Sequence, residues 1–397
     1  GGQGAPVFDL DSVQAIAFLK AMNDGLTVPG RGPGSTLRLP PTSFLIGAAV
    51  SPFKQREAEL MTQLFKLERK LAAGADFIVM QVGFNLRKCF EVPRYLAARG
   101  LKAPVLGNVY ALTLGAARAM AANQVPGCVV SAALLATLEA EARAPDKGKA
   151  ARLERAAKMM ACFKGMGLAG AHIGGFGLAA DDFLHIIRRA DALADDWETF
   201  VGELQFGAPD EYYAFPPPAR YAIDRPDPDP LPGLGLTRKP AAYRFARLMH
   251  ALLFEPRSPL YKLARRYYQA LPEKGVIYRM SHAFEWWIKR QIFGCRDCGD
   301  CAMMDTAYLC PMHNCAKQLR NGPCGGSCNG MCEAFPDERR CAWVMVYERL
   351  KSSGELETLR TGQAPPRNAR LENTSAWSNY YLGRDHRKLN PAPPRAK

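Results

Sequence analysis

Apolar runs of strand length alternate with stretches of helical spacing through the first half of the chain. The clearest helical stretch, residues 56–73, places four leucines on one face and is followed by Gly74. We expect strands at residues 44–50, 76–82, 103–109 and 170–173. We expect helices at residues 13–22, 56–73, 89–99, 113–123, 132–143, 150–164 and 180–193. Strands that alternate with helices predict an α/β fold with a parallel sheet and right-handed crossovers.

The second half of the chain has a different pattern. A proline-rich stretch with a Pro-Asp run at residues 226–230 is typical of a linker. Helices rich in arginine and aromatic residues are expected at residues 244–254, 260–271 and 281–292, and a short apolar helix at 342–350. The end of the chain is polar and rich in proline and arginine, which predicts a basic, disordered tail. The predicted organisation is an α/β part (1–195), a linker (196–240), a helical and cysteine-rich part (241–357) and the tail (358–397).

The chain of 397 residues carries a net charge of +14, and its basic residues concentrate after Thr237. A basic surface could meet an anionic cofactor, an acidic protein or nucleic acid, or it could be a solvated face. Because basic charge and cysteine pairs carry little specificity, we expect no nucleic-acid partner. The sequence has no run of about 18 apolar residues and no signal-peptide pattern, which predicts a cytoplasmic protein with no membrane partner.

Nine of the twelve cysteines fall between Cys295 and Cys341. Their spacing is close to a repeat, C-x2-C-x2-C-x8-C followed by C-x3-C-x3-C-x8-C. The first set is Cys295, Cys298, Cys301 and Cys310, the second is Cys324, Cys328, Cys332 and Cys341, and Cys315 stands between them. Two groups of four thiolates suit two iron–sulfur clusters or two zinc ions.

A disulfide framework is the alternative for these cysteines. The odd count and the large chain without other disulfide-type patterning argue against it. The run that ends at Cys310-Pro311 is similar to a ferredoxin motif with a longer last gap, which favours a 4Fe-4S cluster over zinc. Thiolate ligation serves both metals, and His313 could replace one thiolate.

In parallel α/β folds, chemistry lies at the carboxyl ends of the strands. That rule nominates Ala48 and Ala49 in the first strand and Gln81 in the second. Gln81 is polar within an apolar strand, and its amide can donate to and accept from a heterocycle. A glutamine bonded to neighbouring backbone is the structural alternative.

Seven segments carry a family resemblance by their order and spacing. They are PVFDLDSV, FLIGAAVSP, KLERKLAAGADFIVMQVGFN, VLGNVYALTLGAARAM, VPGCV, ERAAKMMACFKGMGLAGAHIGG and NGPCGG. Together they resemble bacterial 5,10-methylenetetrahydrofolate reductases, in particular the branch with an added cysteine-rich C-terminal domain. The resemblance covers about residues 5–195 and 285–350.

The resemblance implies a (β/α)8 barrel, of the TIM-barrel type, that holds FAD at its strand ends. NAD(P)H reduces the flavin, which passes a hydride to the folate substrate. By position, Ala48 and Ala49 would lie against the flavin, Arg69 and Lys70 near its phosphates, and Gln81 on the pterin ring. For Arg69 and Lys70, the solvated face of a helix is the alternative. The family also implies metal in the cysteine-rich domain, an electron-transfer or methyltransferase partner protein, and a homo-oligomer.

Several residues of the family are absent at the matching positions. The family's acidic proton donor and its Gly-Asp motif precede PVFDLDSV, so the catalytic residue stays unassigned and only about strands five to eight of a barrel are expected. A family glutamine and a family arginine align with Ser131 and near Leu178. These departures favour an alternative function, a non-catalytic or electron-transfer partner subunit with iron–sulfur or zinc centres.

Overall fold

The computed structural model describes residues 9–32, 34–221, 240–272 and 275–389. The Pro-Asp run at residues 226–230 and the last part of the basic tail, residues 390–397, lie outside the described residues. Within the described ranges, no helix is both long and apolar enough to cross a lipid bilayer.

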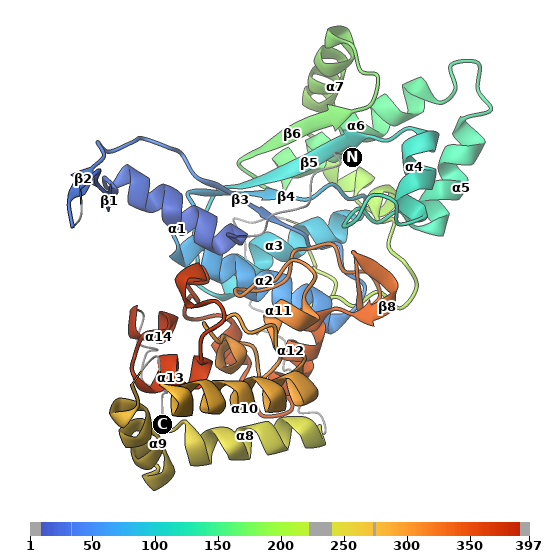
Figure 1. Ribbon diagram of the computed structural model, residues 1–397. Coiled ribbons are helices and arrows are strands. Elements are labelled where there is room, and N and C mark those ends of the chain that lie inside the picture. Colours follow the sequence, from blue (N-terminus) through green and yellow to red (C-terminus); the bar gives the residue numbers. More distant parts are fainter. Residues whose placement is uncertain (1–8, 33, 222–239, 273–274, 390–397) are drawn as a thin grey trace.

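A four-stranded parallel sheet lies at the centre of the first half (Figure 1). Its order follows the sequence: β3 (Gly47–Val50), β4 (Phe77–Met80), β5 (Val105–Ala111) and β6 (Gly170–Gly175). In register, Ala48 pairs with Ile78 and Asn108 pairs with His172. The α/β fold predicted from the alternation is therefore confirmed. The sheet as described is open rather than closed into a barrel.

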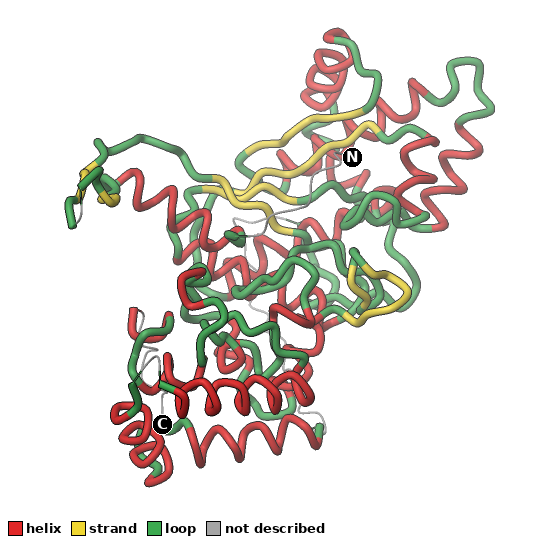
Figure 2. Tube along the Cα trace, in the orientation of Figure 1, coloured by secondary structure: helices red, strands yellow, loops and turns green. Residues whose placement is uncertain are grey.

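Helices connect and flank these strands, as the tube view in Figure 2 shows. They are α1 (Ser12–Asn23), α2 (Glu57–Ala72), α3 (Leu86–Ala98), α4 (Leu114–Ala121), α5 (Ala132–Glu141), α6 (Lys149–Gly165) and α7 (Ala180–Ala192). A small hairpin of β1 (Thr27–Pro29) and β2 (Thr36–Arg38) precedes the sheet. Helix α1 begins with a capping box in which Asp11 accepts from the Val13 and Gln14 amides, which explains the start of this helix.

The two faces of the sheet differ in burial. One face packs on α2, α3 and α6, where Ile78, Val109 and Phe163 are almost fully buried in one apolar core. On the other face, Ala49 is exposed, and the side chain of Leu45, just before β3, is 76% exposed. Helices therefore cover one face of the sheet at the β3 edge, while the opposite face stays accessible.

The second half is built from helices and cysteine-rich loops. Its elements are α8 (Ala241–Leu253), α9 (Pro259–Ala270), α10 (Val276–Phe293), α11 (Pro311–Asn314), β7 (Met331–Cys332), β8 (Phe335–Arg340), α12 (Ala342–Lys351), α13 (Ala376–Tyr381) and α14 (His386–Leu389). Short 3-10 helices lie at Trp197–Phe200, Gly202–Leu204, Met303–Asp305, Leu356–Leu359 and Ala369–Leu371.

Helix α2 joins the two halves of the molecule. Leu67 faces the core beneath the sheet, whereas Leu60 and Leu64 face Trp343 and Tyr347 of α12 in a second core. All five of these side chains are almost fully buried. Because α2 is packed on both sides, the two halves share one continuous interior.

The segment predicted as a disordered tail is folded from residue 358 to residue 389. Ser375 caps α13 by accepting from the Ser378 amide, and Ser375 and Asn379 are buried. Asn379 donates to the Gly299 carbonyl at 2.9 Å, which ties α13 to the first cysteine loop. The composition concealed this order because contacts with distant residues hold the segment, among them the stacking of Tyr381 on Phe254 and Tyr268.

Candidate metal and cofactor site

Four cysteines surround one cavity at the end of α10. Cys295, Cys298, Cys301 and Cys310 line it together with Lys289, and its volume is about 20 Å³. Gly294 ends α10 with φ 62°, which turns the chain so that Cys295 enters the loop. The first set predicted from spacing is therefore brought together by the fold. A cavity of this size between four thiols has room for a metal ion.

The second group of cysteines has Cys315 as a further neighbour, a residue that the spacing places between the two sets. Burial raises the pKa of Cys341 to about 12, and the nearby thiols of Cys324 and Cys315 add to the rise. Burial also raises the pKa of Cys315, with Cys324 and Cys332 as further contributors. The neighbours of Cys315 are thus Cys324, Cys332 and Cys341.

Cys328 has a different environment. Burial raises the pKa of its thiol, and the charges around it belong to Glu59, Lys54 and Arg56 rather than to other cysteines. Its backbone pairs with Met331 across a tight turn. Cys315 therefore lies near three cysteines of the second set, whereas Cys328 lies beside Lys54, which Cys324 and Cys341 also approach.

The side chains are gathered but not arranged as a finished coordination shell. Within the described ranges, no group of three or more His, Cys, Asp or Glu residues has the geometry of a metal site. His313 is exposed and does not line the cavity of the first group. The donor chemistry, four thiols around one small cavity, still fits a thiophilic metal, because thiols become ligands once a metal displaces their protons.

Buried lysines from α2 and the loop before it hold the second cysteine loop. Lys54 donates to the carbonyl oxygens of Gly325 and Ser327, the latter at 2.7 Å. Lys66 donates to the carbonyls of Gly322 and Pro323 at 3.2 and 3.0 Å. Both amino groups therefore lie next to the loop that carries Cys324; burial lowers the pKa of Lys54 and of Lys66, and the nearby Cys324 acts to raise both. Buried cations in this position would offset the negative charge of a thiolate centre.

This loop reaches the carboxyl ends of β3 and β4. A methyl group on Gly127 would lie 3.1 Å from the Gly325 carbonyl oxygen and 3.5 Å from Gln81 Nε2, so the three groups are adjacent. Gln81 Oε1 accepts from the Val82 amide at 2.8 Å, which fixes the orientation of the side-chain amide. The cysteine-rich loop and the predicted folate-binding glutamine therefore share one edge of the sheet.

Two buried polar atoms at this edge lack a partner among the residues that the structure describes. They are Ser51 Oγ, just after β3, and Gln63 Nε2 on α2. Both residues are at least nine-tenths buried and lie close to Gly325. Unsatisfied buried polar groups are rare, so a polar ligand or an ordered water fits this position.

Ala48 and Ala49 lie on opposite faces of β3. Ala48 is 4% exposed and packs with Ile16 and Ile46 on the helix side, so its side chain does not face the open side. Ala49 is exposed on the open face. Of the two residues predicted to lie against a flavin, Ala49 presents its small side chain to that face.

Arg69 and Lys70 are buried, which excludes the solvated-face interpretation of these two residues. Arg69 Nη2 donates to the Thr358 and Thr361 carbonyls at 2.7 and 3.1 Å, and Lys70 donates to the Ala49 carbonyl at 2.5 Å. Burial lowers the pKa of Lys70 to about 7. Their contact with flavin phosphates stays a prediction, and in the structure Arg69 ties α2 to the folded tail.

The positions matching two family residues have local structural roles. Ser131 is the N-cap of α5, where its Oγ accepts from the Leu134 amide at 3.3 Å. Leu178 packs beside Gly175 at the end of β6, where a methyl group on Gly175 would come within 2.8 Å of it. Capping and apolar packing are sufficient reasons for these two residue types.

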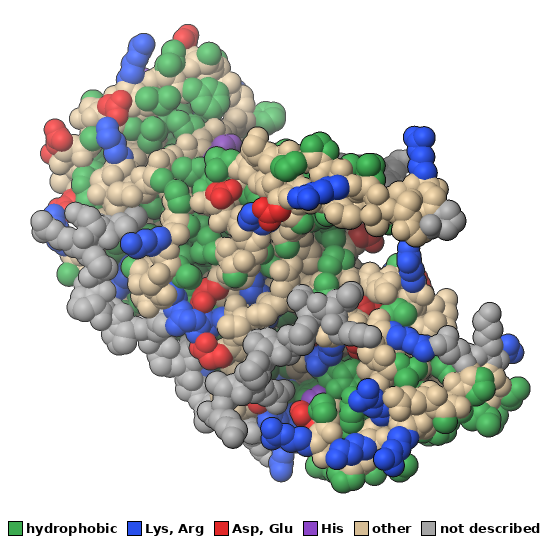
Figure 3. Space-filling model, turned by 90° about the vertical axis from the view of Figure 1, so that its left-hand side faces the viewer, with side chains coloured by type: hydrophobic (Ala, Val, Ile, Leu, Met, Phe, Trp, Pro, Cys, Tyr) green, Lys and Arg blue, Asp and Glu red, His purple; other side chains and the backbone are tan. Residues whose placement is uncertain are grey.

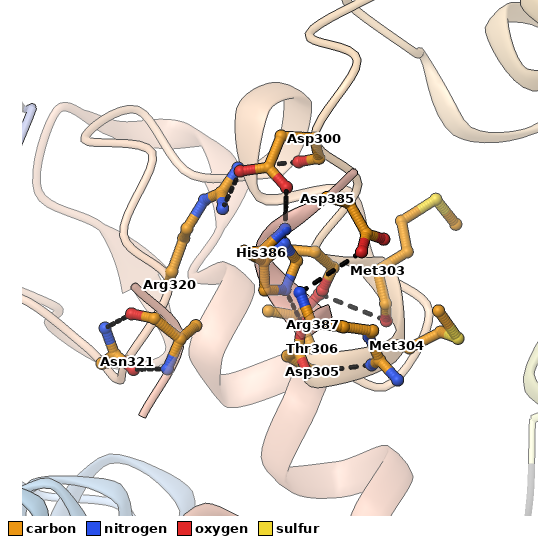
Figure 4. A network of polar contacts seen from close by, with 12 residues as sticks. Asp300, Met303, Met304, Asp305, Thr306, Arg320, Asn321, Asp385, His386 and Arg387 are labelled. Carbon is orange, nitrogen blue, oxygen red and sulfur yellow. Dashed lines mark hydrogen bonds and ion pairs between the residues drawn. The ribbon is translucent and has the colours of Figure 1, made fainter. Parts of the chain in front are cut away.

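A buried charge network beside the first cysteine group was not predicted from the sequence (Figure 4). The Asp300 side chain, fully buried, accepts from Arg320 Nη1 at 3.0 Å and pairs with His386 Nδ1 at 2.6 Å. His386 Nε2 lies 2.9 Å from Asp305, which also pairs with Arg387. Asp300 lies between Cys298 and Cys301, so the network fixes the loop that carries the first cysteine group.

This network makes stability depend on pH through His386. Burial acts to lower its pKa, but the bonds to Asp300 and Asp305 raise it to about 9. Because the folded pKa exceeds the ordinary value of 6.5, the stabilisation is complete below 6.5 and is lost as pH rises through about 9. Asp385, Arg387 and Arg320 also face or adjoin this group.

We expect His386→Gln to destabilise the protein roughly 1–3 kcal/mol more at about pH 6 than at about pH 10. Chemical denaturation of both proteins at the two pH values measures this difference. His185→Gln, on the exposed side of α7, is the matched control and should show no such dependence. An equal loss of unfolding free energy at both pH values for His386→Gln would contradict the explanation that the charge of His386 stabilises the network.

Comparison with known proteins bears on the C-terminal half. A search of curated proteins finds no match. A family model described as "Methylene-tetrahydrofolate reductase C terminal" matches residues 276–370. The match begins with α10 and contains both cysteine groups and α12. Residues 276–370 are therefore a C-terminal region of the methylene-tetrahydrofolate reductase family.

Proposed function

We propose that the chain is part of a flavin-dependent methylenetetrahydrofolate reductase whose C-terminal region holds two thiolate-ligated metal centres. The observation that carries this proposal is the position of the loop at residues 322–328. This loop belongs to the family-matched region and lies at the carboxyl edge of the sheet, beside Gln81 and Ser51. A metal centre held there would lie close to a cofactor bound at the strand ends.

The residues of this edge have compatible roles. When bound, the flavin would accept a hydride from NAD(P)H and deliver it to methylenetetrahydrofolate. Ala49 leaves the open face of β3 unobstructed, and the oriented amide of Gln81 suits a heterocycle with donors and acceptors. Ser51 Oγ and Gln63 Nε2, unpaired within the described part of the chain, offer further polar contacts.

We further propose that the sheet is one half of a (β/α)8 barrel. Four parallel strands in chain order, with helices packed on one face and the other accessible, are the arrangement expected for half of such a barrel. The remaining strands would have to come from a polypeptide segment outside the described residues. Leu45, which is largely exposed, would then become part of the closed interior.

A partner subunit without folate chemistry is the second candidate. The capping role of Ser131 and the packing of Leu178 favour it, because neither side chain can replace a glutamine or an arginine that contacts substrate. In that case the two metal centres would serve electron transfer or stability. Metal without flavin in the purified complete protein would favour this candidate.

The test of the reductase proposal is Gln81→Ala in the complete enzyme. Loss of an amide that contacts only the pterin should lower folate turnover by about 10- to 100-fold. Reduction of the flavin by NAD(P)H, followed by stopped-flow absorbance, should change much less. Gln124→Ala, at an exposed position after α4, is the control. Equal losses in both half-reactions would contradict the assigned role of Gln81.

A further inference from the structure

Three consecutive helices expose apolar stripes that nothing in the described chain covers. On α10, Ile277, Met280, Phe284 and Trp287 recur at helical spacing, and each is between 59% and 67% exposed. The opposite face of α10 is fixed in the protein, since Glu285 and Lys289 are buried. The apolar stripe therefore lies on the outer face of α10, opposite the buried pair of Glu285 and Lys289.

Helices α8 and α9 repeat this arrangement. On α8, Tyr243 and Ala246 are buried while Phe245 and Leu248 are 52% and 55% exposed. On α9, Leu263 is 65% exposed. The three helices lie together at the end of the molecule remote from the sheet (Figure 1). Contiguous exposed apolar side chains on this scale mark an interaction surface.

The charge of the same helices is one-sided. Six exposed cations accompany the apolar residues: Arg244, Lys262, Arg265, Arg266, Arg279 and Arg290. The only acidic residue within α8, α9 and α10 is Glu285, which is buried against Lys289 and Ser375. Figure 3 shows Lys and Arg side chains gathered with hydrophobic ones at the lower right of the molecule.

The combination of exposed apolar stripes and exposed cations indicates which kind of partner binds these three helices. A second copy of the chain would bring like charges together, which disfavours self-association. Nucleic acid would meet the cations but leave the apolar stripes without a counterpart. Cations and apolar side chains are interleaved on the same face, since Arg279 and Arg290 stand within a turn of Met280 and Trp287. An anionic lipid surface accepts both kinds of side chain.

We propose that α8, α9 and α10 bind reversibly to an anionic lipid bilayer. The apolar stripes enter the boundary between headgroups and acyl chains, and the arginines and Lys262 meet the lipid phosphates. The sequence predicted no membrane partner because it lacks a spanning segment, but a surface-bound helix needs none. The proposal is independent of the folate chemistry and of the metal centres.

Vesicle flotation of the purified full chain tests the proposal. Vesicles of phosphatidylcholine with about 30% phosphatidylglycerol should bind the protein, and pure phosphatidylcholine should bind it at least tenfold more weakly. Arg265→Glu combined with Arg266→Glu should lower binding at least tenfold, and so should Phe284→Ser combined with Trp287→Ser. Lys102→Glu combined with Arg188→Glu changes the net charge equally on exposed positions of the first half and should leave binding unchanged.

Three outcomes would overturn the proposal. The first is equal binding to both kinds of vesicle, and the second is absence of binding to either. The third is a dimer in light scattering that Phe284→Ser combined with Trp287→Ser converts to a monomer, since that result would assign the face to a second copy. All substituted residues are exposed, so circular dichroism should confirm that each variant is folded before binding is compared.

Discussion

Replacement of Cys315 with serine is expected to remove about half of the metal bound per chain, whereas replacement of Cys328 should leave the metal content unchanged. The sequence spacing alone predicts the reverse, because it assigns Cys328 to the second set of four. In the structure, Cys315 neighbours Cys324 and Cys332, and Cys328 faces Lys54 and Glu59.

The physical reason is that a four-thiolate site binds its metal cooperatively. Loss of one ligand leaves an open position and exposes three thiolates, so affinity falls steeply. Cys298→Ser, in the first group, should remove the other half of the metal. Elemental analysis of the three variants next to the unchanged protein measures these outcomes. If Cys328→Ser loses metal and Cys315→Ser does not, the grouping drawn from the structure is wrong.

Replacement of Asp300 with alanine is expected to lower the free energy of unfolding by about 3–5 kcal/mol. The carboxylate is fully buried and accepts from Arg320, the His386 ring and the Asn368 amide. Without it, Arg320 and His386 would keep buried charges with fewer partners, which costs more than the lost bonds themselves. Urea denaturation measures the change.

Asp191→Ala is the control for this prediction. Asp191 pairs with Lys164 at 2.9 Å, but its side chain is 59% exposed, so its loss should cost no more than about 0.5 kcal/mol. Losses of similar size for Asp300→Ala and Asp191→Ala would show that the buried network does not hold the first cysteine loop.

The alternation of apolar runs was sufficient to predict the sheet and its helices. Helix α2 was expected at residues 56–73 and spans Glu57–Ala72, and β4 was expected within residues 76–82 and spans Phe77–Met80. Such elements follow from local periodicity, which does not depend on distant parts of the chain. The α/β fold was therefore predictable from the sequence.

The side-chain environments were not predictable in the same way. For Arg69 and Lys70 of α2, a solvated face was the alternative, yet both are buried: Arg69 bonds to the C-terminal half, and Lys70 bonds to the Ala49 carbonyl. His386 lies in a segment whose composition is typical of disorder, and only its partners Asp300 and Asp305 make it structural. Contacts between residues far apart in sequence decide these positions, and local patterns do not report them.

The membership of the cysteine groups illustrates the same limit. Spacing nominated nine cysteines as candidate ligands, and the structure brings the first four together around one cavity. At the second group, the fold adds Cys315 as a neighbour of Cys324, Cys332 and Cys341, because short loops fold back and bring together residues that are not adjacent in the repeat. The distance between a cysteine side chain and a bound metal depends on how the chain folds and cannot be read from the spacing of the motif.

The most direct test of the central claim is an anaerobic determination of iron, zinc and acid-labile sulfide per chain. Two thiolate centres predict about two zinc ions, or about eight iron atoms with about eight sulfides if both centres are 4Fe-4S clusters. Thiol titration on the same sample should find the clustered cysteines largely protected. Less than about half a metal centre per chain, with the clustered thiols freely reactive, would contradict the account.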